Sequence, residues 1–141
     1  MSSPELIVIT LPGGRRVDAQ IGPHTLHTDQ PRDSGGEGSA PSPFDVFLGA
    51  MGTCAGIFVQ GFCAKRGIPT EEIRILERPS FGADGVLAAV DFELQLPTTF
   101  PEKYLEAVVK VAEQCSVKRA MAAQPRFTVR TTVAQASARI A

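Results

Sequence analysis

The chain has 141 residues, a hydrophobic fraction of 43% and a charged fraction of 21%, which predicts one soluble globular domain over residues 1–141. Its 14 basic and 15 acidic residues give a net charge of -1, and no basic, aromatic-rich run is present, so nucleic acid is not an expected partner. The amino terminus lacks the basic region and apolar run of a signal peptide. We therefore expect a cytoplasmic protein whose three cysteines are not a structural disulfide framework.

The first three elements are predicted to be short strands. Residues 6–11 are rich in β-branched side chains and end at a Pro-Gly-Gly turn, after which residues 16–21 pair back. Residues 24–28 form the third strand. The following stretch, residues 29–42, is rich in glycine, serine and proline and is predicted to be the least ordered loop of the chain.

A long helix is predicted next. Ser42 is typical of an N-cap, Pro43 suits the first helical position, and Asp45 places a negative charge in the first turn. Residues 46–64 contain no charge and approach the length of a membrane span, but four glycines and two cysteines make the stretch only moderately hydrophobic. We expect a helix buried by protein rather than by a membrane.

The second half of the chain alternates between strands and helices. Residues 72–77 and 86–96 predict a hairpin, residues 101–114 an amphipathic helix, and residues 116–123 a short helix capped by Ser116. Residues 127–133 alternate again and predict a closing strand. Strands grouped before and after a central helix favour the α+β class over a doubly wound parallel sheet.

The three cysteines differ in their predicted surroundings. Cys63 is interpreted as a packing residue, and Cys54 shares a helix face with Met51 and Phe58, which by periodicity alone also indicates packing. Cys115 falls between two predicted helices, where the free amides of the second helix would stabilise a thiolate. From the residues alone, Cys115 remains either a reactive thiol or a junction residue.

Two basic residues and two histidines also bear on the predicted chemistry. Lys118 and Arg119 follow Cys115 closely enough to favour its thiolate. His24 and His27 fall on opposite faces of a predicted strand, and no metal-ligand spacing occurs, so we expect no metal site.

Two segments resemble the cysteine motifs of the OsmC/Ohr superfamily: PSPFDVFLGAMGTC at residues 41–54 and CSVKRA at residues 115–120. The glycine-rich residues 34–38 and the order of elements match as well, so the resemblance covers nearly the whole chain. It implies an OsmC-like fold, with antiparallel sheets around a long central helix, in an intertwined homodimer. It also implies that Cys54 is the peroxidatic cysteine and Cys115 the resolving cysteine, restored by an external dithiol without metal, flavin or nicotinamide.

Members that are peroxidases also use an arginine beside the first cysteine. Gly-Gly-Arg at residues 13–15 resembles their motif, which makes Arg15 the first candidate and Arg16 or Arg32 the alternatives. A solvated turn explains Arg15 equally well. The second cysteine of the family is usually followed by proline, and Ser116 replaces it here.

The family carboxylate is less well matched. Phe44 occupies the position of the family glutamate, and Asp45 follows one residue later, turned by about 100° on a helix. Asp45 is therefore either a site residue or only a partner of the helix dipole, and Glu37 is an alternative.

The resemblance predicts a thiol-dependent peroxidase that reduces small organic hydroperoxides in oxidative-stress defence. One alternative is a binder of hydrophobic small molecules that uses the surroundings of Phe44, Phe47, Met51 and Phe58. Another is a redox-sensing protein without turnover.

Overall fold

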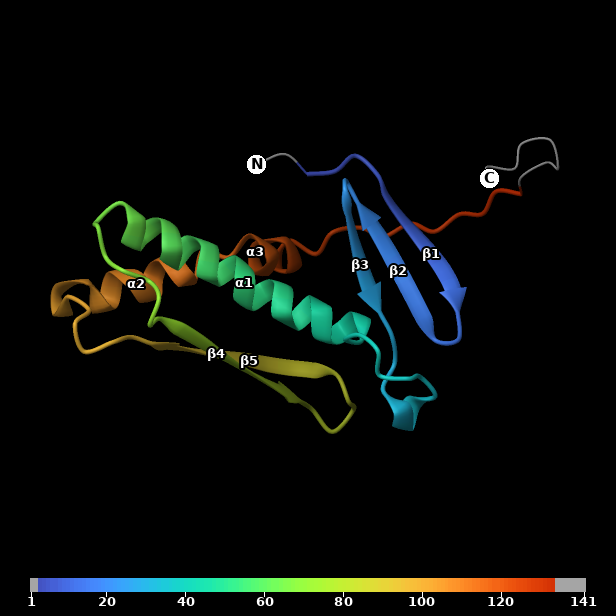
Figure 1. Cartoon of the computed structure of the whole chain (residues 1–141), viewed down its shortest axis with the longest axis horizontal. Helices are drawn as coiled ribbons and strands as arrows, with labels where there is room; N and C mark the ends of the chain where they lie inside the picture. Colours follow the sequence, from blue (N-terminus) through green and yellow to red (C-terminus); the bar gives the residue numbers. More distant parts are fainter. Residues whose placement is uncertain (1–2, 134–141) are drawn as a thin grey trace.

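This computed structural model describes residues 3–133 and contains two antiparallel sheets beside one long helix (Figure 1). The first sheet consists of β1 (Ile7–Gly13), β2 (Arg16–Ile21) and β3 (His24–Thr28) in that order, and the second of β4 (Arg74–Phe81) and β5 (Leu87–Gln95). The helices are α1 (Pro43–Ala64), α2 (Leu105–Ala112) and α3 (Ser116–Ala122). The predicted α+β class is confirmed.

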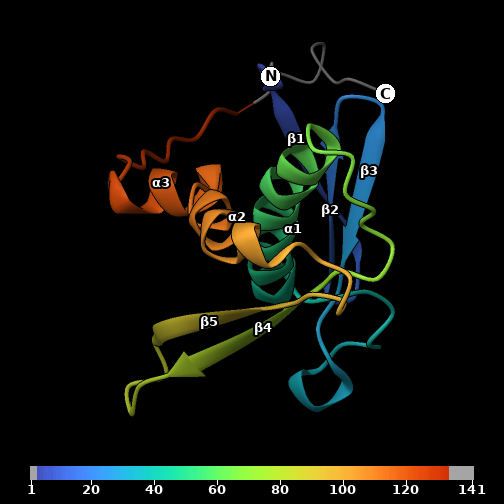
Figure 2. The ribbon, with the colours of Figure 1, turned by 90° about the vertical axis from the view of Figure 1, so that its left-hand side faces the viewer.

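The first sheet separates apolar from polar side chains. In its register Ile9 lies opposite Ala19, which lies opposite Leu26, while Thr10 lies opposite Asp18. Successive strand residues point to opposite faces, so one face of this sheet is apolar and the other is polar. The main contacts of the three strands are with one another. Figure 1 shows this sheet beyond one end of α1, and in the turned view of Figure 2 α1 overlaps it.

The local sequence explains where α1 begins and ends. The Ser42 hydroxyl accepts a hydrogen bond from the backbone N–H of Asp45 at 3.3 Å, and Pro43 is the first helical residue, as predicted. Gly67, with φ of 64°, follows the last turn and lets the chain reverse. By length and composition alone α1 could cross a membrane. The core helices of soluble proteins meet the same two criteria. It packs against α2, α3 and β4.

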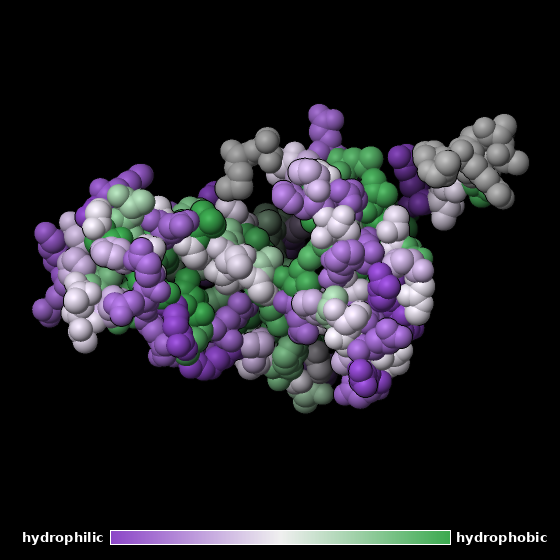
Figure 3. All heavy atoms as spheres, viewed as in Figure 1, coloured by the Kyte–Doolittle hydropathy of each residue, from purple (hydrophilic) through white to green (hydrophobic). Residues whose placement is uncertain are grey.

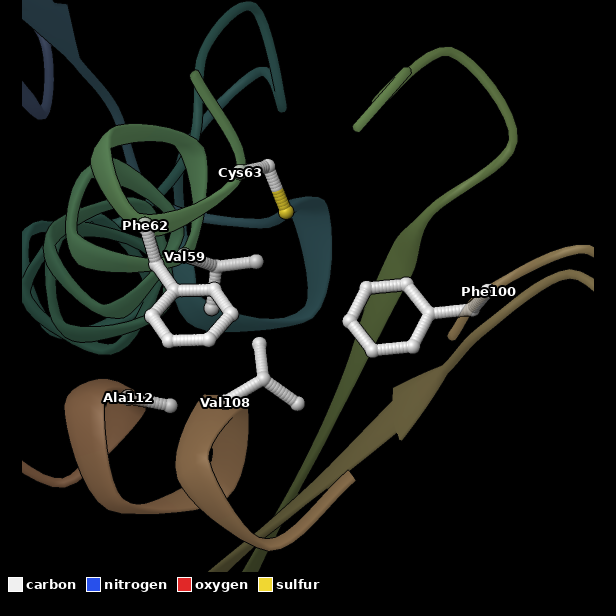
Figure 4. Packing of buried hydrophobic residues seen from close by; sticks show 6 residues of the cluster. All are labelled: Val59, Phe62, Cys63, Phe100, Val108 and Ala112. Atoms are coloured by element: carbon white, nitrogen blue, oxygen red, sulfur yellow. The ribbon is translucent and has the colours of Figure 1, made fainter. Parts of the chain in front are cut away.

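The core lies between one end of α1 and α2 (Figure 4). Its six buried residues are Val59, Phe62, Cys63, Phe100, Val108 and Ala112. Cys63 is 0% exposed, and burial raises the pKa of its thiol above the ordinary value. The interpretation of Cys63 as a packing residue is therefore confirmed.

The loop at residues 29–42 is more ordered than its composition predicted. Asp29 is 1% exposed, and its carboxylate accepts hydrogen bonds from the backbone N–H groups of Gln30, Glu37 and Ser39 and from the Ser39 hydroxyl. These bonds hold the pKa of Asp29 at about 2, with the Ser39 hydroxyl as the largest contributor. One buried carboxylate thus organises the loop that leads into α1.

Three sequence predictions are corrected. Residues 127–133 form no strand in the described chain, because no neighbouring strand pairs with them. Cys115, not Ser116, is the N-cap of α3, and the helix ends at Ala122. The second helix begins as a 3₁₀ turn, Glu102–Tyr104, and becomes α-helical at Leu105.

Candidate active site

The structure brings Cys54 and Cys115 together. Cys54 lies near the middle of α1 and is half-buried, whereas Cys115 lies between α2 and α3 and is 0% exposed. The Cys115 thiol donates a hydrogen bond to the carbonyl oxygen of Met51, one turn before Cys54, at 3.6 Å. Both cysteines are free thiols in this structure.

The surroundings of Cys54 favour its thiolate. Burial raises the pKa of the Cys54 thiol, but the polar groups beside it outweigh this effect: the backbone N–H of Val117, the Cys115 thiol, and the N–H and hydroxyl of Ser116. The net effect lowers the pKa below the ordinary value of a cysteine. The thiolate of Cys54, which is its nucleophilic form, is therefore favoured.

The free amides of α3 act on Cys54. The N–H groups of Val117 and Ser116 lower the pKa of the Cys54 thiol, because α1 places this thiol against the first residues of α3, and the effect expected of these amides on Cys115 stays a prediction. Lys118 instead holds its ammonium 4.8 Å from the centre of the Phe92 ring, and Arg119 is exposed. Sequence spacing could not show this, since the two cysteines lie 61 positions apart.

The arginine candidates lie on the first sheet and its following loop. Arg15 is in the exposed turn between β1 and β2, and Arg16 is the first residue of β2. Arg32 donates a hydrogen bond from Nε to the carbonyl oxygen of Glu37 at 3.4 Å. None of them is among the described groups that lower the pKa of Cys54, so a role for Arg15 stays a prediction.

The carboxylate candidates are also outside the thiol pair. Asp45 is exposed in the first turn of α1, where its backbone completes the Ser42 cap. Glu37 is exposed, and its backbone N–H donates to Asp29. The structure shows a helix-start role for Asp45, and its catalytic role stays a prediction.

Glu77 is a further ionisable residue near α1 and is not among the site residues expected from the sequence. It lies on β4 opposite Phe92, and its Oε1 is buried without a hydrogen-bond partner among residues 3–133. Its Oε2 lies close to α1, because a Cβ atom added at Gly52 would be 2.6 Å from this oxygen. Burial raises the pKa of Glu77. The alternation of β4 could have indicated this residue, because it places Glu77 on the same face as Ile75.

An apolar groove lies between the start of α1, the turn of the second sheet and α3. Its volume is about 500 Å³, and its lining consists of Phe44, Phe47, Phe81, Gly85, Val86, Leu87 and Met121. Leu87 and Met121 also line a neighbouring cavity of about 340 Å³ that reaches Met51. The groove therefore leads toward the residue whose carbonyl binds the Cys115 thiol.

A metal centre has no ligand set in the described part of the chain. Residues 3–133 contain no group of three or more histidine, cysteine, aspartate or glutamate side chains arranged to hold an ion. The candidate site is thus built from thiols, backbone N–H groups and apolar side chains.

Comparison with known proteins gives one family and one fold. The family model described as OsmC-like protein matches residues 36–130, and no curated protein matches the chain. An OsmC like protein from Mycoplasma pneumoniae is 13% identical, with a TM-score of 0.69 over 88% of this chain and 91% of that chain.

Two similar structures carry names that refer to organic hydroperoxides. An organic hydroperoxide resistance protein OsmC from Legionella pneumophila is 23% identical, with a TM-score of 0.53 over 85% of this chain and 91% of that chain. An organic hydroperoxide resistance protein from Elizabethkingia anophelis is 18% identical, with a TM-score of 0.54 over 88% of this chain and 93% of that chain. At these identities the likeness establishes the fold, and the predicted OsmC-like fold is confirmed.

Proposed function

Because the chain belongs to the OsmC-like protein family, we propose that it is a thiol-dependent peroxidase that reduces organic hydroperoxides. The observation that carries the proposal is the lowered pKa of Cys54 beside the second thiol, Cys115. A thiolate is the nucleophile that attacks a peroxide, and a neighbouring thiol is needed to resolve the product. Similar structures named as organic hydroperoxide resistance proteins support the same chemistry.

The proposed reaction has three steps. The Cys54 thiolate attacks the terminal oxygen of ROOH, the O–O bond breaks, and the alkoxide takes a proton to leave as ROH, which leaves Cys54 as a sulfenic acid. The Cys115 thiol attacks the Cys54 sulfur, so that a disulfide forms and water leaves. An external dithiol then reduces this disulfide and is itself oxidised to a disulfide.

The apolar groove would hold the organic part of the hydroperoxide. Three phenylalanines line it, and no charged residue does. A neutral alkyl or aryl group would lose its hydration there, while hydrogen peroxide has no apolar surface to bury. We therefore expect cumene hydroperoxide to oxidise Cys54 faster than hydrogen peroxide does.

Stopped-flow oxidation of the reduced protein tests the proposal. Cumene hydroperoxide should consume the Cys54 thiol far faster than it consumes a free thiol, and Cys54→Ser should abolish the fast phase. Cys115→Ser should keep that phase but stop at the sulfenic acid. Cys63→Ser is the matched control, because Cys63 is buried in the core and should change neither step. A wild-type rate equal to that of a free thiol would refute the peroxidase.

A homodimer is part of the proposal. The exposed side of α1 carries no charged residue between positions 46 and 64, and Ile57 on that side is 58% exposed. A second copy would cover this surface, and the site would then lie at the subunit boundary, within reach of charged residues such as Arg15. Light scattering after size exclusion should give twice the chain mass of 15.0 kDa. Arg15→Ala tests the predicted arginine through the rate of Cys54 oxidation, and Arg16→Ala and Arg32→Ala test the alternatives. Arg74→Ala, at an exposed arginine that begins β4, is the control.

The same groove favours a second candidate, a non-enzymatic binder of apolar small molecules. Its volume of about 500 Å³ suits a ligand of that class. A fluorescent apolar probe should then bind the Cys54→Ser, Cys115→Ser double variant as tightly as the wild type. Binding without any fast thiol oxidation would favour the binder over the peroxidase.

A further inference from the structure

Met121 lies where two neighbouring cavities meet. It is on α3 and lines both the apolar groove of about 500 Å³ and the adjoining cavity of about 340 Å³. The Met121 side chain is 44% exposed, whereas Met51, which also lines the second cavity, is 2% exposed. Hydrophobic residues reach the molecular surface in the region where α1 begins, beside the groove (Figure 3). The Met121 sulfur is therefore within reach of a small molecule in the groove.

The start of α3 connects Met121 with Cys54. The backbone N–H of Val117 lies beside Cys54 and lowers the pKa of its thiol. Met121 follows Val117 by four residues in the same helix, so the two residues share a face of α3 and lie about 6 Å apart along its axis. The Met121 thioether is thus one helical turn from a group that touches the proposed nucleophile.

One cation accompanies Met121. Lys118 comes three residues earlier on α3, on the same side of the helix, and it lines the same cavity of about 340 Å³. Its ammonium is 4.8 Å from the centre of the Phe92 ring, which lines that cavity too. Apart from Lys118, the described residues that line this cavity are uncharged. The ammonium can therefore donate a hydrogen bond to an oxygen that gains negative charge in the cavity.

We propose that Met121 is a site of regulatory oxidation, at which an organic hydroperoxide held in the groove converts the thioether to a sulfoxide. The inference rests on that part of the proposed function which places organic hydroperoxides in the groove. The Met121 sulfur attacks the terminal oxygen of ROOH, so that an S–O bond forms and the O–O bond breaks. The proton on the transferred oxygen passes to the alkoxide, which leaves as ROH beside Lys118. The sulfur loses two electrons and the hydroperoxide gains them, so no further reagent is needed.

The order of oxidation makes Met121 a brake on the reaction. A thiolate is a stronger nucleophile than a neutral thioether, so Cys54 reacts first while it is reduced. When organic hydroperoxide exceeds the external dithiol, the thiol pair stays oxidised and the hydroperoxide in the groove meets Met121. The sulfoxide puts a polar group in place of an apolar one, and the groove then binds alkyl and aryl groups less tightly. Oxidation of Met121 thus slows the protein when its reductant is exhausted.

Mass spectrometry of the Cys54→Ser, Cys115→Ser double variant tests the oxidation without any thiol chemistry. The variant is treated with cumene hydroperoxide or with hydrogen peroxide, and the sulfoxide is measured in the tryptic peptide of residues 120–126, which contains Met121. N-acetylmethioninamide in the same solution reports the rate of a free thioether. Cumene hydroperoxide should oxidise Met121 several-fold faster than the free thioether, because the groove holds the reagent beside the sulfur. Hydrogen peroxide should oxidise the two at similar rates.

A Met121 rate with cumene hydroperoxide no higher than that of the free thioether would overturn the proposal, as would equal acceleration by both reagents. Phe81→Ala, added to the double variant, removes one aromatic wall of the groove and should reduce the preference for cumene hydroperoxide. The matched control is Phe127→Ala, because Phe127 is 85% exposed and is not among the residues that line the groove. The same preference in both of these variants would also contradict a reaction inside the groove.

Lys118→Gln tests the role of the ammonium, with the exposed Lys110→Gln as its control. Oxidation of Met121 by cumene hydroperoxide should slow in Lys118→Gln and stay unchanged in Lys110→Gln. Equal rates in the two variants would remove Lys118 from the reaction.

Binding of a fluorescent apolar probe measures the consequence of oxidation. After treatment with cumene hydroperoxide, the double variant should bind the probe several-fold more weakly than before, and methionine sulfoxide reductase should restore the affinity. The same variant with Met121→Leu added should show equal affinity before and after treatment, whatever its starting value. Unchanged probe affinity after complete oxidation of Met121, or a loss that the reductase does not reverse, would refute the regulatory role.

The outcome is separate from that of the peroxidase test, because the double variant has neither active-site thiol. Selective oxidation of Met121 in a protein whose Cys54 reacts no faster than a free thiol would remove the peroxidase and leave this site. Fast oxidation of Cys54 with unselective oxidation of Met121 would remove only the inference about Met121.

Discussion

Replacing Glu77 by glutamine should stabilise the protein at neutral pH. The carboxyl lies on the face of β4 that packs toward α1, its Oε1 lacks a described hydrogen-bond partner, and its pKa is raised by burial. The only cation beside it on the strand, Arg78, is engaged on the other face by Asp91 and Glu93, at 3.6 and 2.9 Å. The charged form of Glu77 is therefore the disfavoured form in the folded protein.

The sign of the pH dependence follows from the raised pKa. When the folded pKa of an acid exceeds its unfolded value, stability is highest below the unfolded pKa, about 4.3 for glutamate, and falls as pH rises through the folded pKa. A buried polar group without a partner costs about 1–3 kcal/mol. In a protein of this size, each kcal/mol corresponds to roughly 2–4 °C in Tm.

Thermal melts of the wild type and Glu77→Gln between pH 4 and pH 8, at one protein concentration, measure this effect. The two proteins should melt alike at the acid end, and Glu77→Gln should melt at higher temperature at pH 8. Glu72→Gln is the matched control, because Glu72 is exposed and should change little. A wild type at least as stable as Glu77→Gln at pH 8 would refute the assignment of Glu77 as an unpaired, desolvated carboxyl.

Three further predictions concern the thiol, the loop and the core. The Ser116→Pro variant should fold, since proline suits the first position of a helix and Cys115 already has an extended ψ of 123°. The substitution removes one N–H group beside Cys54, so the pKa of the Cys54 thiol should rise. Alkylation of Cys54 by iodoacetamide at pH 7 should then slow several-fold. Asp29→Asn should lower the urea midpoint at neutral pH. The difference in urea midpoint between the wild type and Asp29→Asn should vanish as the pH falls from 3.8 toward 2, because the pKa of Asp29 is lowered in the folded protein. Val108→Ala removes two methyl groups from a 0% exposed site and should cost about 2 kcal/mol in urea unfolding.

Local sequence predicted the elements whose stability is mainly local. The Ser42 cap, the proline after it and the alternation of β5 each depend on neighbouring residues, and the structure confirms them. The loop at residues 29–42 differs from its prediction, because its composition is typical of disorder while one buried side chain, Asp29, supplies its order. Composition indicates the average tendency of a segment toward disorder. It does not show that a single buried carboxylate, such as that of Asp29, accepts enough hydrogen bonds to order the segment.

At residues 127–133 the local pattern is correct but the predicted strand is not formed. The alternation of these residues predicts a strand, and a strand exists only where a neighbouring strand pairs with it. Pattern in one segment does not identify the partner, and here the described chain contains none that pairs. The donors around Cys54 were also beyond local pattern, because α1 and α3 meet only in the folded chain.

The lowered pKa of Cys54 does not depend on the residue at position 44, where the resemblance aligns Phe44 with a family glutamate. Two of the groups that lower the Cys54 pKa are backbone N–H groups, of Val117 and Ser116, and these are fixed by the path of the chain at the start of α3. A side-chain substitution elsewhere on α1 does not remove them. Phe44 instead lines the apolar groove. A carboxylate or an aromatic ring at this position therefore changes what the groove can bind, whereas the backbone N–H groups that lower the pKa of Cys54 stay in place.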